Sequence, residues 1–426
     1  MQTAFTLAQL ADPKLEDANA VLRKCVHCGF CNTTCPTFAL LGDELDGPRG
    51  RIYLMKDMLE HGRVASAQVA LHIDRCLSCL ACVTACPSGV DYRRLVDLAR
   101  QRIEATFRRP ALDRLLRAMI AGVLPRPLLF RMASVAGSAL RPVLAVLPGR
   151  LGAMGQLLPA RVPAPGLVEK PQVFAAEGPR RQRVALLTGC VQSVLGPEIN
   201  AATVRLLTRH GCEVVVAKGV GCCGGLVHHM GRDALGFARA NIDAWTAELN
   251  GHGLDAIIVN TSGCGVTVKD YGHMLREDAR YAANAARIAA LAKDVCEFMH
   301  ALGLKAPVAS TGQRVAYHAP CSLQHGQQIR DEPKRLLAAA GFAVFDVPDG
   351  HLCCGSAGTY NMLQPELAGA LRERKLANIA RTSPALVATG NLGCIVQLQE
   401  GARVPVVHTV ELLDWATGGP APAALS

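Results

Sequence analysis

Cysteine is the residue whose number and spacing in this chain could do chemistry. The chain has 426 residues and 18 cysteines, and eight cysteines lie in the first 100 residues as two identical runs. Each run has the pattern Cys-x2-Cys-x2-Cys-x3-Cys-Pro and the two contain Cys25, Cys28, Cys31 and Cys35, then Cys76, Cys79, Cys82 and Cys86. Residues 1–13 have no basic start followed by an apolar stretch, so export and disulfides are not expected. We therefore predict that these thiolates bind metal.

The spacing of the two runs is that of proteins with two [4Fe–4S] clusters. Three closely spaced cysteines wrap around one corner of a cubane, and the following turn carries the fourth to the other cluster. We predict one cluster bound by Cys25, Cys28, Cys31 and Cys86, and a second bound by Cys35, Cys76, Cys79 and Cys82. Zinc is the alternative, but it prefers two separated pairs of cysteines, and two four-cysteine runs exceed that requirement.

The segment between the two runs carries its own signal. Ile52, Met55 and Leu59 share one helical face, which predicts a helix there instead of the small β-hairpins of short ferredoxins. Arg49 and Arg51 either pack near cluster sulfurs or lie on the surface, and the sequence leaves both interpretations open.

The other ten cysteines lie beyond residue 180, and eight of them belong to an internal repeat. Thirty-one residues separate Cys190 from the pair at 222–223, and 31 separate Cys321 from the pair at 353–354. Each pair is followed by glycine, and each repeat ends in Gly-Cys, at Cys264 and Cys394. This correspondence indicates a duplication.

Each repeat is predicted to alternate strand and helix. Short apolar or β-branched runs indicate buried parallel strands at 184–187, 214–216, 315–317 and 344–347. Helical spacing of apolar residues indicates helices at 198–210 and 335–340. The repeat cysteines then fall at or just beyond strand ends, where open α/β sheets bind ligands.

The chain is thus expected to have a mixed fold. An α-helical, bacterial-ferredoxin-like domain with two [4Fe–4S] clusters spans residues 1–100, and a helical region rich in arginine and proline spans 101–180. A duplicated α/β cysteine-rich domain follows, with its repeats at 181–305 and 306–418 and a tail at 419–426. We refer below to residues 181–305 as repeat 1 and to 306–418 as repeat 2.

The whole pattern resembles the iron–sulfur subunit of bacterial glycolate oxidase. The stretches that carry the resemblance are the paired cysteine runs, GPRGRIYLMK at 47–56, YHAPC at 317–321 and LCCGSAGTYN at 352–361. The wider superfamily includes cysteine-rich subunits of lactate utilisation systems, anaerobic glycerol-3-phosphate dehydrogenase and heterodisulfide reductase.

The resemblance implies an electron-transfer subunit of a complex that oxidises glycolate to glyoxylate. An FAD-bearing partner would take the hydride, and this chain would relay single electrons to a membrane quinone or another acceptor. The chain contains no convincing flavin site and is not expected to act on substrate alone. A lactate or glycerol-3-phosphate complex is the nearest alternative.

The repeat cysteines allow several interpretations. Two candidate sites, for a further cluster or for redox-active thiols, are formed by Cys190, Cys222, Cys223 and Cys264, and by Cys321, Cys353, Cys354 and Cys394. Structural thiols, a zinc scaffold and a thiol or heterodisulfide oxidoreductase remain alternatives. Repeats of the heterodisulfide reductase type end in Cys-x2-Cys, whereas Thr261 and Asn391 occupy the first of those positions here.

Four other residues are expected to have structural roles, and one glycine-rich stretch is not expected to be a functional site. Cys212 and Cys296 have no counterpart in the other repeat, so we expect buried free thiols. His318 and His351 flank the cysteines of repeat 2, and a hydrogen-bonded packing role is favoured for both. Residues 219–224 match G-x-G-x-x-G, with Asp243 about 20 residues on, but repeat 2 keeps only the cysteines of this stretch, so nucleotide binding is not expected.

The cysteine-free middle is apolar and rich in arginine. From 112 to 158, prolines at 125, 127, 142 and 148 are expected to break it into short helices. These helices either dock on the flavoprotein or on anionic lipid, or pack between the two halves of the chain. The net charge of +10 and 4% aromatic content argue against nucleic acid. No apolar run of about 18 residues predicts a membrane span, so we expect a cytoplasmic protein, peripheral on the inner face of the membrane.

Overall fold

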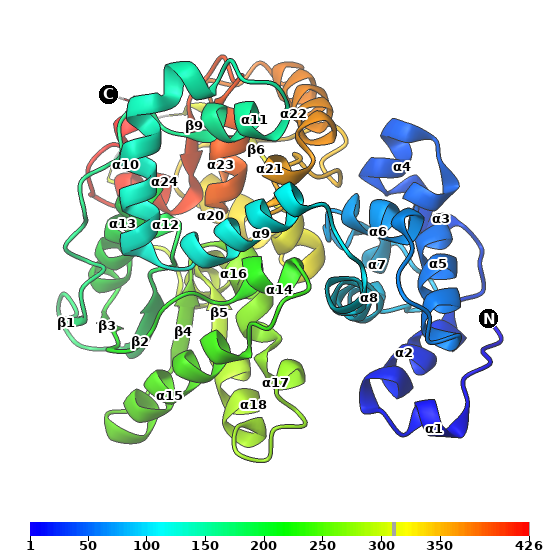
Figure 1. Ribbon diagram of the computed structural model, residues 1–426. Helices are drawn as coiled ribbons and strands as arrows, with labels where there is room; N and C mark the ends of the chain where they lie inside the picture. Colours follow the sequence, from blue (N-terminus) through cyan, green and yellow to red (C-terminus); the bar gives the residue numbers. More distant parts are fainter. Residues whose placement is uncertain (309–311, 426) are drawn as a thin grey trace.

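The N-terminal part of the chain is built from helices packed around one core (Figure 1). The computed structural model describes residues 1–308 and 312–425. The N-terminal helices are α1 (Leu7–Leu10), α2 (Pro13–Lys24), α3 (Phe30–Thr33), α4 (Pro36–Leu41), η1 (Glu44–Asp46), α5 (Pro48–Glu60), α6 (Ala67–Asp74), α7 (Ala81–Thr84) and α8 (Tyr92–Thr106). The predicted helix between the cysteine runs is confirmed as α5, whose Ile52, Met55 and Leu59 are buried in that core.

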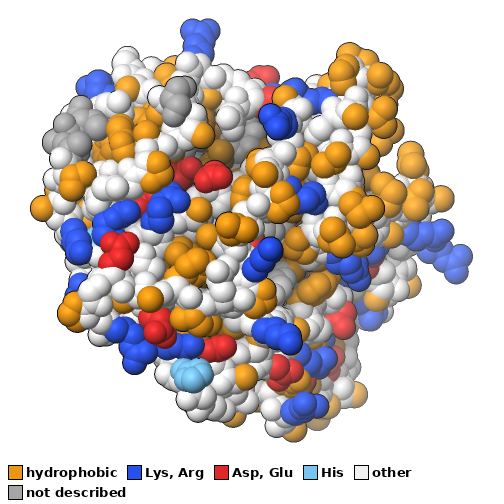
Figure 2. Space-filling view, turned by 90° about the vertical axis from the view of Figure 1, so that its left-hand side faces the viewer, with side chains coloured by type: hydrophobic (Ala, Val, Ile, Leu, Met, Phe, Trp, Pro, Cys, Tyr) orange, Lys and Arg blue, Asp and Glu red, His pale blue; other side chains and the backbone are white. Residues whose placement is uncertain are grey.

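Three helices form the middle region: α9 (Ala111–Val123), α10 (Pro127–Leu144) and α11 (Gly149–Leu157). The prediction that Pro142 breaks a helix is wrong, because it lies inside α10. Only two helical residues follow Pro142, so its missing N–H costs the helix a single bond near its end. Figure 2 shows hydrophobic side chains gathered at its upper right, where α10 and α11 come to lie after the turn from Figure 1.

The two repeats contain sheets of matching topology. The first has the order β1-β3-β2-β4-β5 and the second β7-β6-β8-β9. Their strands are β1 (Gln172–Phe174), β2 (Gln182–Leu187), β3 (Cys212–Val216), β4 (Ala256–Val259), β5 (Ala292–Asp294), β6 (Arg314–Tyr317), β7 (Ala343–Asp346), β8 (Leu386–Thr389) and β9 (Val406–His408). All pairs are parallel except β1 with β3. β1 comes from the middle region, before repeat 1 begins; without it the two orders correspond strand for strand, as a duplication requires.

Helices cover the sheets of both repeats. Repeat 1 contains α12 (Gln192–Leu195), α13 (Pro197–Arg209), α14 (Gly225–His229), α15 (Leu235–Gly251), α16 (Ser262–Lys269), α17 (Tyr271–Met274), α18 (Ala282–Leu291) and α19 (Val295–Leu302). Repeat 2 contains the π-helical turn η2 (Ser322–Gly326), α20 (Glu332–Ala339), α21 (Tyr360–Leu363), α22 (Pro365–Ala380), α23 (Leu392–Gln399), α24 (Thr409–Ala416) and η3 (Ala423–Leu425). The predicted strands and helices of the repeats are confirmed to within a few residues at their ends.

A single apolar core joins the two repeats. It includes strand residues of both sheets, such as Val184, Ile258, Val315 and Val387, all fully buried. Because the sheets share one core, the cysteine-bearing loops at their carboxyl ends are held in fixed relative positions.

The N-terminal helices dock on both repeats through specific polar contacts. Arg94 of α8 donates two hydrogen bonds, of 2.8 and 2.7 Å, to the carboxylate of Asp270 in repeat 1. The Tyr360 hydroxyl of repeat 2 donates to the carbonyl of Arg75 at 3.1 Å. These contacts place the two N-terminal cysteine runs next to the repeats. Within the described residues, no helix combines the length and apolar character needed to cross a membrane.

Candidate metal centres

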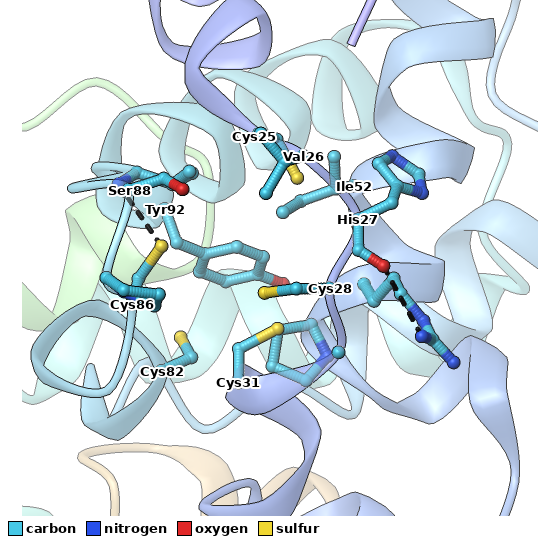
Figure 3. A pocket seen from close by; sticks show the side chains of 15 residues that line it. Cys25, Val26, His27, Cys28, Cys31, Ile52, Cys82, Cys86, Ser88 and Tyr92 are labelled. Atoms are coloured by element: carbon cyan, nitrogen blue, oxygen red, sulfur yellow. Dashed lines mark hydrogen bonds between the residues drawn. The ribbon is translucent and has the colours of Figure 1, made fainter.

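The first predicted cysteine set gathers around one pocket. Cys25, Cys28, Cys31 and Cys86 all line it, and Figure 3 shows their sulfur atoms directed toward a common space. Cys25 ends α2, the next two lie on the following loop and α3, and Cys86 follows α7. Cys28 is exposed, so this pocket lies close to the protein surface.

The loop that directs these sulfurs depends on left-handed backbone. Gly29 has φ +85° and begins α3, and a Cβ there would lie 2.6 Å from an Arg49 guanidinium nitrogen. His27 also has positive φ, at 57°. The second run repeats this geometry with Ser78 and Leu80, at φ 51° and 61°. The two runs therefore adopt the same loop, which non-glycine residues enter only at a cost.

The second predicted set lines a neighbouring pocket. Its members are Cys35, Cys76, Cys79 and Cys82. All four are buried, in contrast to the exposed Cys28 of the first set. Cys82 lines both pockets, so the two lie side by side. The structure thus places the fourth cysteine of each run with the first three of the other; that each set binds a cluster stays a prediction.

The donor set fits a multivalent metal group. Burial, followed by the charge of the neighbouring Cys25, raises the pKa of the Cys31 thiol to about 11. Burial likewise raises the pKa of Cys79 and Cys82. Thiols crowded in this way cannot all ionise unless a cation compensates their charge, which iron in a cluster would do. Backbone N–H groups also donate to sulfur, from Ser78 to Cys76 at 3.4 Å.

Arg51 is a buried cation beside the second set, and it resolves one question that the sequence left open. Its side chain is 1% exposed, and Nη1 lies 3.8 Å from Cys35 Sγ. The same guanidinium contacts Asp46 at 3.4 Å and donates to the His72 carbonyl at 2.7 Å. Arg49 instead pairs with Glu44 in a half-exposed position near the surface. Arg51 is therefore a buried charge beside the second set, whereas Arg49 lines the first pocket from a position open to water.

The repeat cysteines come together within each repeat, as their predicted sets require. In repeat 1, the Cys190 thiol donates to Cys222 Sγ at 3.4 Å. Hydrogen bonds from Cys190 and then Cys223 lower the pKa of Cys222 well below that of an ordinary thiol. Cys264 contacts Cys223, which completes the set.

In repeat 2, Cys321 and Cys353 lie 3.7 Å apart between sulfurs, and Cys354 and Cys394 lie 3.5 Å apart. Asn391, at the position where the sequence pattern lacks a cysteine, donates to Cys394 Sγ at 3.4 Å. Asn391 therefore contacts the sulfur of the repeat's last cysteine through its amide.

Both repeat sites open on one large, mainly apolar cavity of about 490 Å³. Its floor carries cysteines of both repeats: Cys190, Cys223, Cys264, Cys321, Cys353, Cys354 and Cys394. Its roof is formed by side chains of α9, α10 and α11, including Ile120, Phe130 and Leu157. The cavity therefore joins the thiol sites to the helices that carry the exposed apolar surface.

The second N-terminal set lies directly against repeat 2. Cys79 packs in one apolar cluster with Cys353, Tyr360 and the partly buried Cys321. The sites consequently follow one another from the exposed Cys28, through the buried second set, to the thiols of repeat 2 and the cavity.

Two residues of repeat 2 differ from what the sequence analysis expected or singled out. His318 is 1% exposed, yet neither ring nitrogen has a hydrogen-bond partner among the described residues, so the predicted hydrogen-bonded packing role is wrong for it. Lys375 of α22 is buried and its ammonium donates to the Asp349 carbonyl at 3.0 Å. The neighbouring thiols, Cys354 foremost, oppose the lowering of its pKa by burial. The sequence could have indicated this residue, because Lys375 lies among the buried positions of the helix at 365–380.

The remaining sequence candidates take structural positions. Cys212 and Cys296 are buried thiols that line none of the three cysteine pockets described above. The ring of His351 is half-buried, and its carbonyl lies 3.0 Å from His325 Nε2. Asp243 accepts a hydrogen bond from the Tyr281 hydroxyl at 2.9 Å, so its carboxylate has a partner within repeat 1.

Comparison with known families identifies both cysteine-bearing regions. A family model described as a 4Fe-4S dicluster domain matches residues 21–90. A model described as a cysteine-rich domain matches twice, at 184–269 and 315–399. The matches support iron–sulfur binding in the N-terminal domain and the duplication that follows it.

Two relatives match almost the whole chain, and a third matches about half of it. The chain is 42% identical to the glycolate oxidase iron-sulfur subunit of Escherichia coli (strain K12), over 98% of this chain and 99% of the relative. It is 32% identical to the probable glycolate oxidase iron-sulfur subunit of Bacillus subtilis (strain 168), over 93% and 94% of the two chains. Lactate utilization protein A of Geobacillus kaustophilus (strain HTA426) is 26% identical, over 54% of this chain and 98% of that protein.

A solved structure shares the fold. It is described as the crystal structure of a hypothetical protein from Helicobacter pylori, and it matches with a TM-score of 0.53 and 8% sequence identity. The match covers 97% of this chain and 74% of that one, so it extends across every region described above.

Proposed function

This chain belongs to the family of glycolate oxidase iron–sulfur subunits, and from that premise we propose that it relays electrons from an FAD-bearing partner to a membrane quinone during the oxidation of glycolate to glyoxylate. The observation that carries the proposal is the order of the sites, from the exposed Cys28 to the cavity of the repeats. Each cluster, when bound, accepts and releases one electron. The chain positions the centres, and the partner holds the substrate.

The entry point is the surface around the first cysteine set. Cys28 is exposed, and Val26 and Phe30, which flank it in sequence, are large apolar residues 68% and 61% exposed. Exposed apolar groups beside a redox centre suit a surface that a partner subunit covers. The flavin partner would dock here, because electron transfer requires a short distance between the two redox groups.

The route inward passes the second set and ends at repeat 2. The apolar contact of Cys79 with Cys353 keeps water out of this step. Both flavin electrons can pass in succession, because each centre needs to hold only one at a time. The repeat thiols, with a further cluster or as redox thiols, form the last station in the chain.

The exit is the apolar cavity beneath α9–α11. A quinone has an apolar ring and tail, and its carbonyl oxygens accept hydrogen bonds. Ser134 Oγ and His229 Nδ1 belong to residues lining this cavity, are themselves buried, and have no hydrogen-bond partner among the described residues. Reduction to quinol takes two electrons, delivered by the relay, and two protons from water, for which these groups offer hydrogen-bonding positions.

The surface over the cavity suits a membrane. Residues 107–168 contain nine arginines and one acidic residue, a net charge of +8 out of the chain's +10. Exposed apolar side chains accompany them on the three helices and on the link between α10 and α11: Leu112, Leu115, Met119, Leu128, Leu129, Met132, Val135, Leu140, Val143, Val146, Leu147 and Leu151. Apolar side chains among arginines bind the interface of an anionic bilayer. We place this surface on the inner face of the cell membrane.

The substrate and relay are tested with the complex purified under anaerobic conditions. Glycolate should bleach the cluster absorption within the turnover time, whereas the isolated chain should respond to dithionite but not to glycolate. Reduction by lactate or glycerol 3-phosphate and not by glycolate would assign the complex to another substrate. A colourless chain with bound zinc would refute the redox role altogether.

The membrane surface is tested by substitution on α10. Leu128→Asp with Met132→Asp places two charges on one exposed face, and should reduce flotation with anionic vesicles at least tenfold. Burying one such side chain contributes about 1.5–3 kcal/mol. Leu7→Asp, at an exposed leucine of α1, is the matched control and should leave flotation unchanged. Equal flotation of all three proteins would remove α10 from the proposed membrane surface.

A further inference from the structure

We propose that the imidazole of His318 is a metal ligand in repeat 2, where it binds the same metal atom as the thiolates of Cys354 and Cys394. This inference deepens the proposed function, on which it rests, by specifying a metal site at the inner end of the relay. It assigns a nitrogen donor to a site for which the sequence suggested sulfur alone.

The three donors are close enough to share one atom. One ring nitrogen of His318 and the sulfurs of Cys354 and Cys394 all lie within 4.8 Å of one another, and all three residues are buried. The two sulfurs are 3.5 Å apart. Tetrahedral thiolates bound at about 2.3 Å from one metal have sulfurs about 3.8 Å apart, close to this value.

The histidine has no other polar role among the described residues. Both ring nitrogens lack a hydrogen-bond partner there, although the side chain is 1% exposed. Buried polar groups are nearly always paired, because an unpaired one loses its hydration without compensation. A metal ion would satisfy one nitrogen through its lone pair, and the other would keep its proton.

A buried histidine at this position occurs in repeat 2 but not in repeat 1. His318 precedes Cys321 by three residues, and the residue three before Cys190 in repeat 1 is Leu187, which is packed in an apolar core. The buried Lys375 likewise occurs only in repeat 2, since the equivalent position, counted from the cysteine pair, is Ala244. Repeat 2 thus adds a neutral donor and a cation around its thiols, which suits a site where several thiolates are ionised.

Either an iron of a cluster or a zinc ion could take this donor set, so the experiment distinguishes them. The full chain is purified without oxygen, and its metals are counted. The N-terminal clusters account for about eight irons, and the proposal expects iron or zinc beyond that number. If the extra metal is iron, pulsed EPR should show a nitrogen coupling that changes on labelling histidine with ¹⁵N. If it is zinc, X-ray absorption should show imidazole scattering.

Two substitutions and a control complete the test. His318→Leu, which installs the residue of repeat 1, should remove at least half of the extra metal. His318→Cys should retain the metal and abolish the nitrogen signal. His351→Gln, at the half-buried histidine beside the same cysteines, should change neither.

Three outcomes would overturn the inference. They are no metal beyond the N-terminal eight irons, no histidine nitrogen at the extra metal, or full metal retention in His318→Leu. Each would leave the relay through the N-terminal clusters intact. The proposed function itself fails only if those clusters are absent or do not respond to the reduced partner, so the two failures are distinguishable. Retained dithionite bleaching of the N-terminal clusters shows that a variant is folded.

Discussion

Arg51 should set the reduction potential of the cluster predicted at Cys35, Cys76, Cys79 and Cys82. Its guanidinium lies 3.8 Å from Cys35 Sγ and is 1% exposed, so water screens it poorly. A nearby positive charge stabilises the reduced cluster, which carries one more electron. Arg51→Gln removes that charge and should therefore make the potential more negative.

The size of the shift follows from Coulomb's law. An electron spread over irons a few ångströms beyond the sulfur lies about 7 Å from the guanidinium, which at an effective dielectric constant of about 20 gives about 2.4 kcal/mol. For one electron this corresponds to about 100 mV. The shift is an upper value, because Asp46 neutralises part of the charge from 3.4 Å.

The variant is expected to fold, although breaking a buried pair costs about 3–5 kcal/mol when a charge is left alone. Asp46 keeps two other partners, Arg75 at 2.7 Å and His72 at 3.0 Å. Arg51→Lys retains the charge and serves as the matched control.

The assay is a redox titration followed by EPR at low temperature. The cluster predicted at Cys25, Cys28, Cys31 and Cys86 is the internal reference, since Arg51 does not line its pocket. One signal should shift in Arg51→Gln and the other should not. Unchanged potentials for both signals, or an equal shift in Arg51→Lys, would refute the electrostatic reasoning.

Three further predictions follow from the geometry. If each fourth cysteine belongs with the other run, Cys86→Ser should perturb the same EPR signal as a substitution in the first run. It should not change the other EPR signal, which is the one that Cys79→Ser removes. Although burial acts against both shifts, contact with Asp97 at 3.2 Å raises the pKa of His228, and His228 lowers that of Asp97 to about 2. The ion pair is therefore fully formed between about pH 4 and 6.5, and its stabilising effect is lost as pH rises through the pKa of His228 in the folded protein. His228→Gln should consequently lower the urea midpoint of unfolding more at pH 6 than at pH 9. Lys375→Met should weaken retention of metal by repeat 2 against a chelator while the N-terminal clusters remain, because a buried cation beside the thiols is lost.

The sequence predicted the arrangement of the cysteines better than their surroundings. Spacing alone placed Cys86 with the first run and Cys35 with the second, because the rigid loop geometry leaves each fourth cysteine pointing away from its neighbours. Strand positions in the repeats followed from continuous apolar runs such as 184–187, which are typical of a sheet buried on both faces. In both cases the local sequence pattern was enough to predict the position of the feature.

Features that depend on tertiary contact were not predictable. The role of His318 depends on the approach of Cys354 and Cys394, which lie 36 and 76 residues further along the chain. The burial of Arg51 depends on Asp46 and the carbonyl of His72, and a sequence containing Arg49 two residues earlier gives no reason to choose between them. Pro142 was misjudged because its effect depends on its distance from the helix end.

The middle region shows why its two sequence interpretations need not compete. The inner side of the middle region packs against the rest of the chain. Asp74 of α6 pairs with Arg109 and Arg117, at 2.6 and 2.9 Å, and so holds α9 against the N-terminal domain. Arg150 donates to the Leu363 carbonyl at 2.9 Å and ties α11 to repeat 2. These bonds hold the inward faces over the cavity, while the outward apolar faces are exposed in the part of the chain that the structure describes. A lid held in this way can rest on a bilayer without unfolding, so an apolar acceptor could pass from lipid to the thiol sites with little exposure to water.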